Sequence, residues 1–297
     1  MEITDQNKGN LYILLTAILW STGGILLKWV PGNAVLINGA RSFVAFAFFC
    51  FFRKGKKIRV NRIICLAAVC MCMTNLLFVL ANKLTTAANA IVLQDSAPIF
   101  VMTWDSIYRK KLPKKKQILV MLMAFGGIFL FFFDQLDGGH LLGNLIAICA
   151  GMMFSGVFFL NSLPDSGSED SSVLAFFLAT ILAVPFFRDA TLWDGKAVLA
   201  ILALGIFQVG LAYVFFAKGS RLTTPVSASL ISLMEAVLNP IWVLIFYGEK
   251  MGKYALIGAV IILFSVVLNV LHSSEEENVQ KKKLFKSQAE IICNKSE

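Results

Sequence analysis

The chain has 297 residues, of which 58% are hydrophobic, and it carries a formal net charge of +9 at pH 7. Soluble domains are typically about 45–50% apolar, so this composition indicates an integral membrane protein. The apolar runs are continuous and reach the roughly 20 residues that a transmembrane helix needs, unlike the short alternating strands of outer-membrane barrels. About ten such runs use nearly the whole chain, which leaves no room for a soluble catalytic domain.

The apolar runs predict ten transmembrane helices. The first run is too long for the core of a signal peptide, which spans about 7–15 residues, so we expect it to remain as a helix. A short cytoplasmic tail, residues 1–9, precedes it, and a charged tail that we expect to be disordered, residues 273–297, follows the last helix. The predicted helices are residues 10–30, 34–52, 62–82, 87–108, 117–133, 141–161, 172–187, 197–217, 226–247 and 254–272.

Two loops are strongly basic: residues 53–62, after the second predicted helix, and residues 109–116, after the fourth. Basic loops resist translocation, so we expect both loops in the cytoplasm. The N- and C-termini then also lie in the cytoplasm. We expect a multi-pass protein of the cell (plasma) membrane. The positive charge is therefore a topology signal, and we expect no nucleic-acid partner.

Polar residues interrupt the apolar run of residues 222–250. Glu235 and Asn239 lie near its middle. A charged side chain at the bilayer centre costs about 3 kcal/mol or more, so it normally faces a protein interior or a wet cavity. Ser232, Glu235, Asn239 and Trp242 recur at helical spacing and form one stripe, which we expect to line such a cavity.

The same pattern occurs earlier, in residues 84–111. Both segments begin Leu-Thr-Thr and place a carboxylate in mid-span, at Asp95 and at Glu235. Both also contain Pro-Ile-aromatic-Val, beginning at Pro98 and at Pro240. Duplication of an ancestral half is the simplest account of these matches.

The starts of the two halves match as well. Both read Gly-Asn-Leu, at residues 9–11 and 143–145, and this alignment places Ser21 opposite Ser155. Five helices per half turn the second half upside down relative to the first. We therefore predict an all-α integral membrane protein with ten transmembrane helices in two inverted five-helix repeats, residues 10–134 and 140–272. Two such halves around buried polar groups are the usual construction of a secondary transporter.

Several short patterns occur together in this chain: Leu19-Trp20-Ser21, Lys28, Ala40-Arg41, Leu93-Gln94, residues 97–101, residues 233–243, Gly248-Glu249, Gly126, Gly127 and Gly258. They resemble the EamA-type transporters of the drug/metabolite transporter superfamily. The resemblance covers both halves and implies that helices one to four and six to nine surround a central cavity, with helices five and ten at the periphery. Two residues depart from it: Asp95 stands where such proteins often have an aromatic residue, and Ala236 where they often have proline. A substrate is therefore not transferred from relatives.

Three charged residues are candidates for binding a substrate or an ion. Glu235 either serves transport or hydrogen-bonds a neighbouring helix, and the same alternatives hold for Asp95. Arg41 lies about 12 Å into the second span, from a rise of 1.5 Å per residue. It either forms a structural bridge with Asp95 or Glu235 or binds an anionic group of the substrate.

Five further residues complete the candidate site. Trp20 and Trp242 either stack on a substrate or pack within the membrane. Ser21 and Asn239 offer hydrogen bonds to a substrate, and Gln94 either does the same or hydrogen-bonds a neighbouring helix. Amides elsewhere in the spans are expected to bond between helices, at Asn38, Asn75, Asn89 and Gln208.

The remaining residues exclude several classes of protein. The cysteines show no metal-binding spacing, the two histidines stand alone, and no phosphate-binding nucleotide loop occurs. We expect no cofactor, no metal and no enzymatic activity. The prediction is a secondary active transporter, a monomer or homodimer, that moves a small amphipathic metabolite or amino acid by alternating access. Export is the expected direction, and protons, through Glu235, are the candidate coupling ion. The alternatives are an intramembrane enzyme and a non-transporting membrane receptor or scaffold.

Overall fold

The computed structural model describes residues 4–23, 26, 29–136, 139–186, 188, 194–247 and 252–272. Within these residues every regular element is a helix. The first half contains α1 (Asp5–Ser21), α3 (Ala34–Phe52), α4 (Arg62–Leu84), α5 (Ala87–Gln94), α6 (Ala97–Arg109), α7 (Lys115–Phe131) and the short 3-10 helix η1 (Phe133–Gln135). The second half contains α8 (Leu141–Ser162), α9 (Ser168–Ala183), the 3-10 helix η2 (Val184–Phe186), α10 (Gly195–Ala203), the π-helix η4 (Leu204–Leu211), α11 (Ala212–Gly219), α12 (Pro225–Ser232), α13 (Met234–Tyr247) and a last helix, Lys253–His272.

These helices confirm the ten predicted spans. In the described part of the chain, seven helices are long and apolar enough to cross a membrane. The other three spans are α1 and α7, each 17 residues long, and the fourth span, which is divided into α5 and α6. A span of 17 residues is at the short end of the range of about 17–25 that crosses a bilayer.

The first span differs from its predicted bounds of residues 10–30. Helix α1 begins at Asp5 because the side chain of Thr4 accepts a hydrogen bond of 3.3 Å from the backbone N–H of Asn7 and caps the helix. The helix thus begins within the polar residues that precede the apolar run. Helix α1 ends at Ser21, residues 23 and 26 are helical again, and residues 24, 25, 27 and 28 of the predicted span lie outside the described residues.

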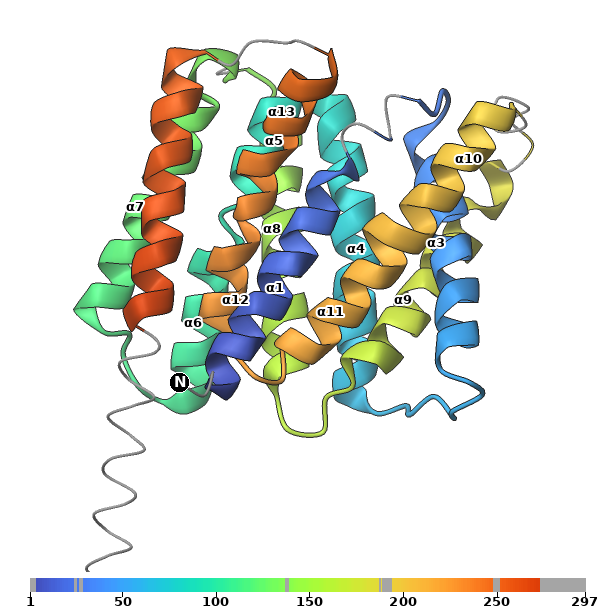
Figure 1. Ribbon diagram of the computed structural model, residues 1–297, viewed down its shortest axis with the longest axis horizontal. Coiled ribbons are helices and arrows are strands. Elements are labelled where there is room, and N and C mark those ends of the chain that lie inside the picture. The colour runs from blue at the N-terminus through green and yellow to red at the C-terminus, as the bar shows by residue number, and fades with distance from the viewer. Residues whose placement is uncertain are drawn as a thin grey trace, which may run out of the picture.

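The two halves are inverted. Helices α3 and α9 are the second span of each half, and they pack against each other. Arg53, which caps the C-terminal end of α3, forms an ion pair with Asp170 in the first turn of α9. The end of one helix therefore meets the start of its counterpart, and the two run in opposite directions (Figure 1).

Helices α7 and Lys253–His272, the fifth span of each half, pack together at one side of the bundle (Figure 1). Two glycines allow the close approach. A Cβ atom on Gly258 would lie 2.4 Å from the backbone nitrogen of Phe131, and one on Gly127 would lie 2.9 Å from the side chain of Ile262. The peripheral position of spans five and ten agrees with the expectation from the resemblance.

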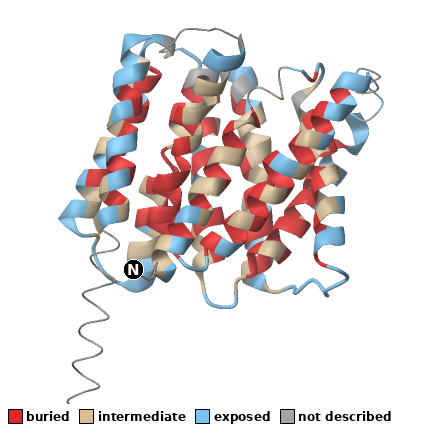
Figure 2. Cartoon of the chain, viewed as in Figure 1, coloured by how far each residue is buried: buried red, intermediate tan, exposed pale blue. Residues whose placement is uncertain are grey.

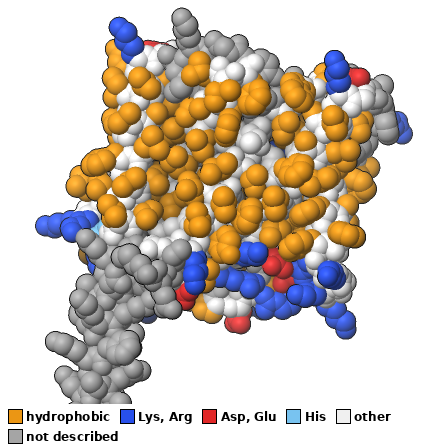
Figure 3. Space-filling model, viewed as in Figure 1, with side chains coloured by type: hydrophobic (Ala, Val, Ile, Leu, Met, Phe, Trp, Pro, Cys, Tyr) orange, Lys and Arg blue, Asp and Glu red, His pale blue; other side chains and the backbone are white. Residues whose placement is uncertain are grey.

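The outer surface of the bundle is apolar. Buried residues are concentrated where helices lie against one another, and exposed residues lie on the outside and toward the ends of the bundle (Figure 2). Large hydrophobic side chains such as Phe43 and Leu199 are more than half exposed, at 55% and 66%, as a lipid-facing surface requires. Lysine and arginine side chains gather along one end (Figure 3), which we call the basic end and which carries the loop of residues 53–61.

Candidate functional site

Arg41 lies inside the bundle and binds three amide side chains. Its Nε and Nη2 atoms donate hydrogen bonds of 3.1 and 2.9 Å to Oδ1 of Asn38, one turn earlier on α3. Nη2 also donates to Oδ1 of Asn75 on α4 at 3.2 Å, and Nη1 donates to Oε1 of Gln208 on η4 at 3.2 Å. The guanidinium group thus joins three spans through neutral acceptors.

A bridge between Arg41 and a carboxylate was one of the two alternatives for this residue, and it does not form among the described residues. Within the described residues, Arg41 forms no ion pair with Asp95 or Glu235. The amides that the sequence assigned to bonds between helices are its partners instead. The positive charge of Arg41 lies in an apolar span, and no carboxylate of the described residues binds it directly.

The π-helix η4 brings Gln208 to Arg41. Two glycines let this segment lie directly against α3. A Cβ atom on Gly205 would lie 2.4 Å from Cβ of Val44, and one on Gly210 would lie 2.7 Å from the ring of Phe48. A π-helical segment is rare and is frequently found at functional sites. Gln208 also donates a hydrogen bond of 3.4 Å from Nε2 to the backbone oxygen of Trp20, so it ties α1 to the same network.

Asp95 lies at a break in the fourth span. Helix α5 ends at Gln94, Asp95 caps its C-terminal end, and α6 begins at Ala97. Pro98 stands in the first turn of α6, where the missing N–H of proline costs no hydrogen bond. The run of residues 87–108, predicted as one span, is therefore two half-helices that meet at a carboxylate.

Glu235 lies at the corresponding break in the ninth span. Helix α12 ends at Ser232, and α13 begins at Met234, so Glu235 is in the first turn of α13. A carboxylate is favourable there because the N-terminal end of a helix carries partial positive charge. Discontinuous helices in corresponding spans of two inverted halves are how many secondary transporters build their substrate and ion sites.

Glu235 is close enough to both other charged candidates to interact with them electrostatically. It interacts with Asp95 and with Arg41, and Arg41 also interacts with Tyr213 on α11. Arg41, Asp95 and Glu235 are each partly exposed although they lie within the spans. A charged side chain within a membrane span normally faces the protein interior or a wet cavity rather than lipid.

Asp95 and Gln94 have different surroundings from Arg41. Asp95 lines a small cleft together with Leu230 of α12, Leu233 at the C-cap of α12, Pro98 and Ile99 of α6, and Met121, Ala124 and Phe125 of α7. The Oε1 atom of Gln94 is buried and has no hydrogen-bond partner among the described residues. The structure therefore places Asp95 toward a peripheral helix and leaves an acceptor on Gln94 available.

Two tryptophans form hydrogen bonds to the corresponding serines of the two halves. Nε1 of Trp242 on α13 donates to Oγ of Ser21 on α1 at 2.8 Å. Nε1 of Trp104 on α6 donates to Oγ of Ser155 on α8 at 3.0 Å. The first contact joins spans nine and one, and the second joins spans four and six, which are their counterparts in the inverted halves.

The remaining candidates differ in burial. Trp20 is only 5% exposed and packs against Phe154, Tyr213 and Phe216, so it belongs to the aromatic core. Asn239 is partly buried, one turn after Glu235 on α13. Lys28, Gly248, Glu249 and the tail of residues 273–297 lie outside the described residues.

Ten membrane helices in two inverted halves, broken at carboxylates in corresponding spans, define an integral membrane transporter of the inverted-repeat class. The family model described as the EamA-like transporter family matches residues 7–133 and 141–271. The chain belongs to this family, as its resemblance predicted, and it is a membrane transporter and not an enzyme.

Curated relatives match nearly the full length of the chain. It is 24% identical over 284 residues to the Uncharacterized transporter YwfM of Bacillus subtilis (strain 168), covering 88% of this chain and 94% of that protein. It is 22% identical over 297 residues to the Uncharacterized inner membrane transporter YicL of Salmonella typhimurium, covering 91% of this chain and 97% of that protein. A solved structure titled Crystal structure of protein has the same fold, with a TM-score of 0.78, 15% identity and coverage of 91% of this chain and 98% of that one.

Proposed function

We propose that this protein is a secondary active transporter that moves a small amphipathic metabolite or amino acid out of the cell by alternating access. The observation that carries the proposal is the set of charges inside the bundle. Arg41 is held by neutral amides, while two carboxylates lie at helix breaks within range of electrostatic interaction. Such a cavity suits a solute that has both a negative and a positive group.

Arg41 supports binding of the negative group. Its four hydrogen bonds go to uncharged oxygens, from Asn38, Asn75 and Gln208. Hydrogen bonds to an ionised acceptor are about twice as strong as those between neutral groups, so a carboxylate that replaces one amide gains energy. The amides that remain hold the guanidinium group in place.

Glu235 supports coupling to protons. It lies in mid-span, it is partly exposed, and the charges of Arg41 and Asp95 act on it. An ionisable residue in this position is costly to keep in a membrane unless it is used, and proton relays in transporters use such carboxylates. We propose that Glu235 carries the proton and that its charge changes as the cavity changes sides.

The two repeats and the orientation belong to the same proposal. We propose that residues 10–134 and 140–272 form the halves, and the two segments that the family model matches, residues 7–133 and 141–271, support these bounds. We propose that the basic end faces the cytoplasm of a plasma membrane, with the N- and C-termini on that side. The gathering of Lys and Arg along this end supports the orientation (Figure 3).

The test is transport into vesicles that contain the purified full-length chain. Amino acids and small amphipathic acids and amines, each isotopically labelled, are offered with and without an imposed pH gradient, from either side of the membrane. We expect saturable uptake of at least one solute, increased by the gradient and lost in Arg41→Ala. Binding without movement would indicate a receptor or scaffold and would overturn the proposal.

A further inference from the structure

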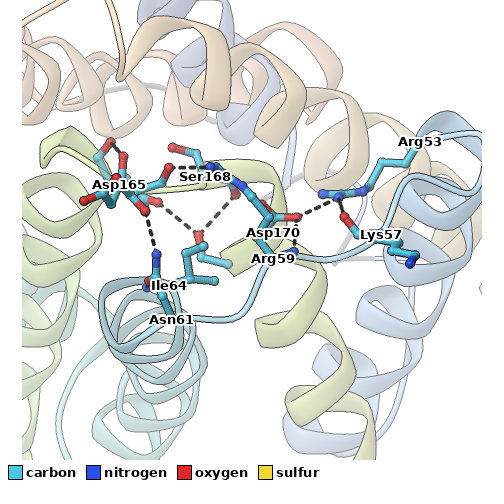
Figure 4. Close-up of polar contacts among 11 residues, drawn as sticks. Arg53, Lys57, Arg59, Asn61, Ile64, Asp165, Ser168 and Asp170 are labelled. Atoms are coloured by element: carbon cyan, nitrogen blue, oxygen red, sulfur yellow. Dashed lines mark hydrogen bonds and ion pairs between the residues drawn. The ribbon is translucent and has the colours of Figure 1, made fainter.

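Asp170 is the centre of an ion-pair cluster at the basic end of the bundle (Figure 4). One of its oxygens pairs with Nη2 of Arg53 at 2.6 Å, and it also accepts from the backbone N–H of Arg59 at 3.2 Å. Its other oxygen accepts from Nε of Arg59, also at 3.2 Å. A single carboxylate thus holds two arginines.

The cluster joins loops from the two halves of the protein. Arg59 and Asn61 belong to the segment between α3 and α4, whereas Asp165 and Ser166 belong to the segment between α8 and α9. Nη2 of Arg59 donates to the backbone oxygen of Ser166 at 3.0 Å, and Nδ2 of Asn61 donates to that of Asp165 at 2.8 Å. Gly167 leaves no room for a side chain, since a Cβ atom would lie 2.7 Å from Oδ2 of Asp170. The two loops are fitted closely together.

The central pair is buried and imperfectly satisfied. The side chains of Arg53 and Asp170 are 8% and 7% exposed. Yet Nε and Nη1 of Arg53 are buried and have no hydrogen-bond partner in the part of the chain that the structure describes. Removing two charges from water is costly, and a buried ion pair is weak evidence for stability. Separation of the loops would hydrate these unpartnered donors, which lowers the free-energy cost of opening.

The opposite end of the bundle has no equivalent pair among the described residues. Arg188 follows α9 and η2 as Arg53 follows α3, but Arg188 is exposed and no described ion pair includes it. The other described ion pairs, Lys8–Asp5 and Arg109–Asp105, each lie within one helix. Among the residues that the structure describes, an ion pair between the two halves is therefore found at the basic end and not at the opposite end.

We propose that Arg53 and Asp170 form a gate that closes the basic end of the transport path and that separates when the cavity opens to that side. The proposal rests on the transport function proposed above. It differs from a static brace in one respect: the loops of residues 53–61 and 163–167 must move apart during each cycle. Closure of one end while the other is open is what alternating access requires.

The first test measures the distance between the loops without any substrate. Spin labels are placed at two exposed positions, Lys56→Cys and Pro164→Cys, in a full-length chain whose native cysteines have been replaced. In lipid bilayers, the parent should give mainly one short distance. Asp170→Asn should add a longer population, whereas the control Asp105→Asn, which breaks an ion pair within α6, should not.

The second test keeps the ion pair intact, so it does not depend on the folding of an Asp170 variant. A short, reducible cross-linker between the same two cysteines should abolish transport, and reduction should restore it. A control cross-link within α1, between Asp5→Cys and Lys8→Cys, should leave transport unchanged.

Either of two results would overturn the gate: transport by the cross-linked protein at the parent rate, or an unchanged distance in folded Asp170→Asn. If the loops separate in Asp170→Asn but no offered solute is transported, the proposed solute class fails, while the control of loop separation by the Arg53–Asp170 pair is upheld.

Discussion

Oγ1 of Thr223 donates a hydrogen bond of 2.5 Å to Oδ1 of Asn10, joining the turn before α12 to the start of α1. The inverted half contains the same contact, because Oγ1 of Thr85 donates to Oδ1 of Asn144 at 2.7 Å. The Gly-Asn-Leu of one half thus packs on the Leu-Thr-Thr of the other, once at each end of the bundle. The sequence shows Gly-Asn-Leu and Leu-Thr-Thr only as repeated motifs, and in the structure the two motifs contact each other.

The glycine of this contact should tolerate no side chain. A Cβ atom on Gly143 would lie 2.5 Å from the backbone carbon of Leu84, whereas one on Gly126 meets nothing within 4 Å. We expect Gly143→Ala to lower the free energy of unfolding by about 1–3 kcal/mol, the usual cost of overpacking. Gly126→Ala is the matched control, and it should be neutral or stabilising by up to about 1 kcal/mol because alanine favours a helix. Thermal unfolding in detergent measures both, and equal melting temperatures would contradict the close packing.

Arg41 should couple to Gln208 and not to Asp95. Its Nη1 atom donates to Oε1 of Gln208 at 3.2 Å, while no described ion pair joins it to Asp95. Residues in one hydrogen-bond network typically show interaction energies of about 0.5–3 kcal/mol in a double-mutant cycle. We expect a value in that range for Arg41→Ala with Gln208→Ala, and less than about 0.5 kcal/mol for Arg41→Ala with Asp95→Ala.

The measurement for these cycles is the melting temperature of each single and double variant, with transport assayed in parallel. Strong coupling between Arg41 and Asp95 would show that they pair in the membrane. In that case Arg41 would be a structural bridge, and the proposed role in binding an anionic group would be withdrawn.

Thiol labelling of intact cells should report the orientation of the protein. Gly195, at the start of α10, lies at the end of the bundle opposite the basic loop, and a Cβ atom there meets nothing within 4 Å. A cysteine at Gly195 should therefore react with a membrane-impermeant reagent added outside, in a chain without its native cysteines. A cysteine at exposed Lys56 should react only after the cells are opened. Labelling of Lys56→Cys in intact cells would reverse the proposed topology.

The helices and the repeat were predictable because their causes are local. Each span is a long, mainly apolar run, and the matching carboxylates and prolines stand at fixed places within two of them. Glu235 was identified because a charge in the membrane is costly. This cost can be evaluated from the sequence without knowing any distant contact. The same local reading correctly expected bonds between helices from Asn75 and Gln208.

The rest depends on contacts between distant parts of the chain. The π-helix η4 reflects how closely Gly205 and Gly210 approach α3, and an apolar run cannot reveal this. Arg53 was predicted as one of many basic residues that set the topology, yet it is buried against Asp170 from the other half. Loop charges determine orientation through their number, whereas their pairing depends on the tertiary structure.

Glu235→Gln should abolish accumulation of solute driven by a pH gradient. The amide keeps the shape and much of the hydrogen bonding of the carboxylate but cannot release a proton. Glu235 lies in the first turn of α13 and forms no ion pair with another described residue. Replacing its carboxylate with an amide therefore breaks no described ion pair. We therefore expect the melting temperature and substrate binding to stay close to those of the parent. Exchange of labelled for unlabelled solute across the membrane should also survive, because it requires no net movement of protons.

The matched control is Asp105→Asn, which removes a carboxylate that pairs with Arg109 within α6, at 2.7 Å, away from the charges around Arg41. It should accumulate solute at the parent rate under the same gradient. The comparison is made in vesicles, with proton movement followed by an internal pH-sensitive dye. If Glu235→Gln accumulates solute against its gradient as well as the parent does, Glu235 is structural. Asp95→Asn then becomes the variant to test, because Asp95 is the carboxylate at the corresponding break in the fourth span.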